Sequence, residues 1–140
     1  MKKMILLLGV LSSSPALAVD DFYEHTFGAP NAYMSGTDNT TFFSRPVSIP
    51  LNGTSITNVS WNWGQYTNGA TSQHMRLCYR AQYSRVQHPC ITISDAPIGE
   101  DSAFNGLSAR GSFDLIHRLE GGSYPVYPTH SDTLRVDYEY

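Results

Sequence analysis

Apolar and polar residues alternate in short runs along much of the chain, beginning near Arg45. Clear runs cover residues 59–63, 113–119 and 134–140, and Gly, Pro and Asn separate them. Alternation with a period of two is typical of strands that bury one face. No stretch keeps a helical period over the dozen or so residues that a stable helix needs. The pattern predicts an all-β fold of about six to eight strands, which we interpret as a small antiparallel β-sandwich, immunoglobulin-like or related.

Two weaker alternations predict further strands. Val47, Ile49 and Leu51 alternate directly before an Asn-Gly pair, which favours a tight turn, so we expect a strand over residues 45–51. A short alternation over 124–126 predicts another strand before the last one.

Two cysteines lie in a predicted hairpin. If residues 73–80 and 87–94 pair as a hairpin with its tip near Ser84, Cys78 lies opposite Cys90 and the apolar face stays continuous. We therefore expect a cross-strand disulfide. Closing a loop of about 12 residues stabilises a fold by roughly 3 kcal/mol in the chain-entropy model.

A metal site is the alternative for these cysteines, because His74 and His88 lie close to Cys78 and Cys90 in the sequence. An even number of thiols in an exported chain favours the disulfide instead. We expect neither a metal nor a cofactor.

The first residues have the features of a secretory signal peptide. Lys2 and Lys3 precede an apolar run over 4–11, and small residues follow it. This pattern predicts a leader over residues 1–18 that is cleaved before Val19. The apolar run is shorter than the roughly 20 residues of a membrane-spanning helix, and no later segment is long and apolar enough. The predicted location is the periplasm, or alternatively the secreted fraction or cell surface.

The charge balance excludes some partners. The chain carries a net charge of −3, and both of its lysines lie in the predicted leader, so the mature chain has a net charge of −5. Binding to nucleic acid or to an acidic membrane surface needs a basic field. We expect neither.

The predicted mature chain forms one domain over residues 19–140, with an aromatic-rich N-terminal arm over 19–44. Gly and Pro interrupt this arm, which predicts at most one short strand there. We expect its aromatic residues to cover an edge of the sandwich; the alternative is a strip that binds a partner or stacks on sugars.

No catalytic constellation is evident. Residues 106–111 resemble a nucleophile elbow only superficially, because the second Gly is one position too late. His117 shares a strand face with leucines, which is typical of a histidine at the edge of a core. Most of the carboxylates that might pair for glycosidase chemistry are expected to be solvated loop charges; these are Asp95, Glu100, Asp101 and Asp114. The prediction is a protein that is not an enzyme.

Several short motifs over residues 59–138 resemble the flagellar periplasmic protein FlhE family. They are Val-Ser-Trp at 59–61, Met-Arg-Leu-Cys at 75–78 with a second cysteine after a hairpin, Phe-Asn-Gly at 104–106, Glu-Gly-Gly at 120–122 and Leu-Arg-Val-Asp-Tyr at 134–138. The resemblance implies a non-enzymatic β-sandwich that acts at the flagellar export apparatus from the periplasmic side. It also implies a link to swarming and to limiting proton leak, with flagellar export or rod components as partners.

A role of this kind needs a surface that binds a protein, and exposed Tyr and Arg are enriched at interfaces. The predicted contact residues lie in and beside the hairpin tip and in a proline-bounded loop: Tyr79, Arg80, Tyr83, Arg85, Tyr124 and Tyr127. The alternative function is a secreted carbohydrate-binding or adhesin-type module, or a subunit of a surface or toxin assembly.

Overall fold

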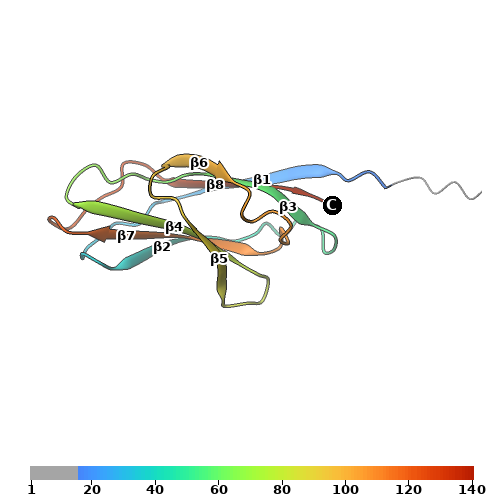
Figure 1. Cartoon of the computed structure of the whole chain (residues 1–140), viewed down its shortest axis with the longest axis horizontal. Helices are drawn as coiled ribbons and strands as arrows, with labels where there is room; N and C mark the ends of the chain where they lie inside the picture. The colour runs from blue at the N-terminus through green and yellow to red at the C-terminus, as the bar shows by residue number, and fades with distance from the viewer. Residues whose placement is uncertain (1–15) are drawn as a thin grey trace, which may run out of the picture.

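The computed structural model describes residues 16–140, which form two antiparallel β-sheets of four strands each. The β1 sheet has the order β1-β8-β3-β6, and the β2 sheet has the order β2-β7-β4-β5. Figure 1 shows the two sheets as stacked layers. The strands are β1 (Asp20–Phe27), β2 (Asp38–Phe43), β3 (Ser55–Asn62), β4 (Ser72–Arg80), β5 (Gln87–Thr92), β6 (Ile98–Asp101), β7 (Ser112–Glu120) and β8 (Asp132–Glu139). The predicted all-β sandwich is confirmed.

The core lies between the two sheets and is built mainly on their inner strands. β8 pairs with both β1 and β3, and its alternate residues from Asp132 to Tyr138 are buried. β7 pairs with both β2 and β4, and Phe113, Leu115 and Leu119 are almost fully buried. Burying a large apolar side chain contributes about 1.5–3 kcal/mol. The alternation that predicted these two strands therefore reflects their packing against the opposite sheet.

The hairpin prediction is confirmed in its register. Cys78 lies opposite Cys90, and Leu77 lies opposite Ile91. Beyond Cys78 the register shifts by one residue, so that Arg80 pairs with Gln87. The loop that joins β4 to β5 projects below its layer in Figure 1. The predicted tip near Ser84 therefore lies in a loop that projects from the sheet, and the neighbouring Tyr83 is 97% exposed.

Two predicted strands are wrong. Residues 45–51 form turns, and only Ile49 is buried, whereas Val47 and Leu51 are 95% and 76% exposed. This segment pairs with none of the described strands, so its alternation does not correspond to a strand of either sheet. Residues 124–126 contribute only an isolated bridge between Val126 and Ala32.

The predicted N-terminal arm holds more strand than expected. β1 and β2 both lie within residues 19–44, and each is the edge strand of its own sheet. The backbone of β1 pairs with β8 over its whole length, so exposed side chains still leave a well-paired strand. The interruptions at Gly28, Pro30 and Gly36 fall in the connection between the two strands.

Most of the predicted leader lies outside the described residues, because these begin at residue 16. Within residues 16–140, no helix is long and apolar enough to cross a membrane.

Candidate functional site

The structure brings together only some of the predicted contact residues. Arg80 and Tyr83 line the same surface hollow at the β4–β5 hairpin, and Arg85 is exposed in the same loop. Tyr79 is 3% exposed and packs in the core, so the expectation that it is exposed is wrong. Its side chain points inward because residues two apart in a strand share a face, and Leu77 lies on the buried face of β4.

Tyr124 and Tyr127 lie at the other end of the sandwich. Arg80 pairs with Ser112 at the start of β7, whereas both tyrosines follow the end of β7 at Glu120. Tyr124 is partly buried, and Tyr127 is 53% exposed. A single partner-binding surface at the hairpin therefore does not include Tyr124 and Tyr127.

The hollow at the hairpin has a volume of about 320 Å³ and lies at the point where β4 ends. We call it the hairpin hollow. Its lining residues come from the ends of β2 and β4, the hairpin loop and the approach to β7: Phe42, Ser44, Arg45, Arg80, Ala81, Gln82, Tyr83, Ser84, Arg110 and Ser112. No carboxylate is among them.

Arg80 is held at the hollow by a buried carboxylate. Asp114 is 1% exposed and lies on the outward face of β7. Its Oδ2 accepts hydrogen bonds from the Arg80 guanidinium and, at 2.6 Å, from Gln87 Nε2. The guanidinium also lies 5.7 Å from the centroid of the Phe42 ring. Asp114 is therefore an anchor within the fold, contrary to the prediction of a solvated carboxylate.

Arg110 approaches the hollow from the turn before β7. Its Nε donates to Gln82 Oε1 at 3.0 Å, and its Nη1 donates to the carbonyl of Ile49 at 2.8 Å. The residue is only 9% exposed. These contacts hold the guanidinium in place without neutralising its charge, because each acceptor is uncharged.

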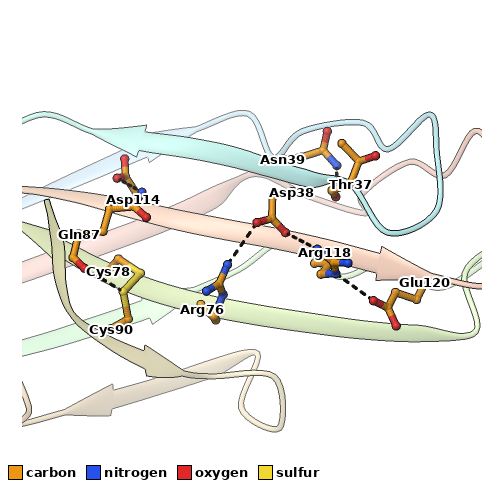
Figure 2. Close-up of polar contacts among 10 residues, drawn as sticks. All are labelled: Thr37, Asp38, Asn39, Arg76, Cys78, Gln87, Cys90, Asp114, Arg118 and Glu120. Atoms are coloured by element: carbon orange, nitrogen blue, oxygen red, sulfur yellow. Dashed lines mark hydrogen bonds and ion pairs between the residues drawn. A yellow bond between two sulfur atoms is a disulfide. The ribbon is translucent and has the colours of Figure 1, made fainter. Parts of the chain in front are cut away.

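The disulfide lies on the outer face of the β2 sheet, next to Asp114. Cys78 and Cys90 are bonded, with their Cα atoms 4.1 Å apart, which confirms the predicted bridge. Figure 2 shows it beside Gln87 and Asp114. A metal site that needs both thiols is thereby excluded. Among residues 16–140, no three His, Cys, Asp or Glu side chains are placed to hold a metal ion.

Farther along the same face, exposed charges form a short network (Figure 2). Asp38 lies 3.2 Å from Arg76 and 3.4 Å from Arg118. Arg118 Nε donates to Glu120 at 2.9 Å, and this hydrogen bond lowers the pKa of the Glu120 carboxyl. Exposed pairs of this kind contribute little to stability. They do keep this part of the face electrically balanced.

A second polar cluster is buried between the sheets. The Asp132 carboxylate accepts hydrogen bonds from Thr41 Oγ1, from the Gly64 amide at 2.7 Å and from His117 Nε2 at 2.7 Å. His117 and Asp132 are both 0% exposed. His117 lies deeper than the core edge expected for it, and its contact with Asp132 is not evident from the sequence. The cluster resembles a catalytic pair in composition, but neither side chain reaches the surface of this structure.

The outer face of the β1 sheet carries a larger hollow of about 510 Å³. Its polar lining includes Glu24, Glu100, Asn62 and Arg135. Trp61 borders it but is only 6% exposed, and its indole Nε1 donates to the carbonyl of Ala96 at 2.8 Å. This hollow therefore lacks a broad exposed tryptophan face.

The sequence did not predict the members of the hairpin hollow that come from outside the hairpin, among them Phe42, Arg45 and Arg110. Residues 106–111 do form a turn, as predicted, and that turn delivers Arg110. The register between β4 and β7 would have placed Arg110 near the hairpin, since Arg80 pairs with Ser112. That pairing is not readable from either strand alone.

Comparison with known proteins identifies the fold. No protein-family model matches the sequence, and no curated protein matches it significantly. Among solved structures, the crystal structure of FlhE is similar, with a TM-score of 0.67 and 17% sequence identity. The similarity covers 86% of this chain and 98% of the FlhE chain. The chain therefore has an FlhE-like fold.

Proposed function

We propose that this chain is an exported, periplasmic accessory protein of the flagellar export apparatus, and that it acts by binding a protein partner. The observation that carries the proposal is the similarity to FlhE, which extends over 98% of that chain. The disulfide between Cys78 and Cys90 fits export, because oxidising compartments allow such bonds to persist. Flagellar export or rod components are the proposed partners.

Binding, not catalysis, is the proposed activity. The polar lining of the hairpin hollow includes arginines and serines, and that of the hollow on the β1 sheet includes carboxylates, an amide and an arginine. The histidine and aspartate that could act as a general base pair are both sealed in the core. A general base must reach the proton that it abstracts.

Deletion of the gene tests this role in the cell. We expect reduced swarming and a fall in cytoplasmic pH in acidic medium, because the accessory protein limits proton leak through the export channel. The full chain should restore both, whereas a chain without residues 1–18 should restore neither. Unchanged swarming and cytoplasmic pH in the deletion strain would reject the flagellar role.

A secreted carbohydrate-binding module is the second candidate. The 510 Å³ hollow on the β1 sheet favours it, because carboxylates and an amide can bind sugar hydroxyls. We expect Trp61 to stack only weakly on a sugar ring, because the residue is largely buried. Binding of the purified protein to a glycan array, lost in Asn62→Ala, would favour this candidate over the first.

A further inference from the structure

The hairpin hollow has the charge and shape to hold an anionic group. We propose that it binds an acidic segment of a protein partner, with a carboxylate side chain seated against Arg45 and Arg110. The inference rests on the proposed function in one respect, namely that the partner is a protein. It adds which end of the molecule makes contact and which charge the partner presents.

The distribution of ion pairs isolates this end of the molecule. Arg76, Arg80, Arg118 and Arg135 each lie within 4.0 Å of a carboxylate. Among the described residues, the arginines that form no such pair are Arg45, Arg85 and Arg110. All of these lie in the hairpin loop or in the wall of the hollow. A chain of net negative charge thus keeps its uncompensated positive charge in one place.

Arg110 is the strongest single indication. Its guanidinium is held by the carbonyls of Ile49 and Pro50 and by Gln82, and it is only 9% exposed. Buried charges are usually paired with an opposite charge, because desolvation costs more than neutral acceptors return. A carboxylate from outside would supply that charge. Such a carboxylate could reach Arg110 through the hollow, because Arg110 is part of the wall of the hollow.

The rim of the hollow suits a peptide better than a small ion. Phe42 is 51% exposed on one wall, and Tyr83 is 97% exposed in the loop. Tyr83 has φ of +64°, a conformation that costs energy for a residue with a side chain. Tyrosine and phenylalanine are typical anchors of protein interfaces. Serine hydroxyls at positions 44, 84 and 112 add hydrogen-bonding groups for a backbone.

Titration of the isotope-labelled full mature protein tests the inference by NMR. The probes are acetyl-(Glu)4-amide, acetyl-(Lys)4-amide and sodium sulfate, each in 50 mM salt. We expect the glutamate peptide alone to shift the Arg45 and Arg110 side-chain signals and the amides of the hairpin loop, in a saturable manner. Raising the salt to 300 mM should weaken binding.

Two variants localise the effect. Arg45→Gln should weaken binding of the glutamate peptide by roughly three- to five-fold, as expected for one partly exposed charge pair. Arg118→Gln is the matched control, because Arg118 lies on the same sheet but outside the hollow. It should leave the affinity unchanged. Both variants should keep the wild-type backbone spectrum elsewhere.

Three results would overturn the inference: no shift with the glutamate peptide, equal shifts with the lysine peptide, or equal saturation by sulfate. The last would indicate a small-anion site. None of them bears on the flagellar role, which the swarming and cytoplasmic pH measurements test independently. Conversely, peptide binding in a protein whose deletion leaves swarming and pH unchanged would reject that role and keep the acidic-segment site.

Discussion

At the scale of single residues, Asp132 links the two sheets. It lies on β8 of the β1 sheet, whereas Thr41 and His117 lie on β2 and β7 of the β2 sheet. Thr41 Oγ1, the Gly64 amide and His117 Nε2 all lie within hydrogen-bond distance of this one buried carboxylate. These hydrogen bonds satisfy the carboxylate and connect β8 of one sheet to β2 and β7 of the other.

Asp132→Ala is therefore expected to destabilise the fold strongly. The change leaves buried donors of Thr41, Gly64 and His117 without their acceptor, which should cost about 3 kcal/mol or more. Urea unfolding followed by circular dichroism measures this loss. Asp95→Ala is the control, because Asp95 is exposed in a loop. Similar unfolding midpoints for the two variants would contradict the role given to Asp132.

Buried tyrosines predict a loss of stability at alkaline pH. Burial raises the pKa of Tyr66, and the nearby Asp132 raises it further; burial likewise raises the pKa of Tyr23. In the unfolded chain both phenols ionise near the ordinary value of about 10. Their contribution to stability is thus full below pH of about 10 and is lost as the pH rises above it.

Residues 19–140 contain no lysine, so no lysine side chain titrates in the same pH range as these phenols. The urea midpoint should fall steadily between pH 9 and 11, and Tyr66→Phe should reduce the slope. A midpoint that stays constant through pH 11 would show that these phenols ionise as easily in the folded state as in the unfolded one.

At the scale of elements, the β4–β5 hairpin depends on its disulfide. β5 is an edge strand of six residues with only partly buried side chains, so packing alone holds it weakly. Reducing the bond between Cys78 and Cys90 should lower the free energy of unfolding by roughly 3 kcal/mol. Urea unfolding with and without reductant measures this, and intact mass after alkylation confirms the reduction. An unchanged midpoint after full reduction would contradict the prediction.

The entry into β7 depends on a glycine. A Cβ at Gly111 would lie 2.3 Å from Cε2 of the Tyr79 ring, whose hydroxyl donates to the Ser108 carbonyl at 2.8 Å. Gly111→Ala should therefore cost about 1–3 kcal/mol, because the buried ring has to move. Gly28→Ala is the matched control, since no atom lies within 4 Å of its Cβ position. Thermal unfolding should separate the two variants.

Strands that bury one face against the opposite sheet could be predicted from the sequence, because every second residue of such a strand is apolar. β7 and β8 show this, as does the register that brings Cys78 to Cys90. β1 was harder to predict, since backbone pairing with β8 holds it while most of its side chains are exposed. The contact between His117 and Asp132 depends on how the sheets stack, which no local pattern records.

The candidate site was predictable only in part, for a similar reason. Arg80 and Tyr83 belong to one hairpin, and the sequence places them together. Arg45 and Arg110 reach the same hollow from segments that are far apart along the chain. Tyr79 shares the buried face of β4 with Met75 and Leu77, so its side chain belongs to the core and not to the site.

At the scale of the whole molecule, the hairpin end and the opposite end differ in character. The hairpin end carries the arginines without ion pairs and an exposed tyrosine, while the charges around Asp38 and Glu120 are mutually paired. A rigid sandwich with one such end can present it to a partner without changing its fold. We therefore expect partner binding to depend on the hairpin and to tolerate changes elsewhere on the surface.

Site-specific photo-crosslinking in living cells tests the central claim most directly. A photoreactive phenylalanine analogue replaces Tyr83 in one strain and Val47, which is 95% exposed outside the hairpin hollow, in another. We expect the protein in the periplasmic fraction to be crosslinked through position 83, and not through position 47, to a flagellar export or rod component identified by mass spectrometry. Crosslinking of position 83 to no such component, in a strain that makes flagella, would contradict the central claim.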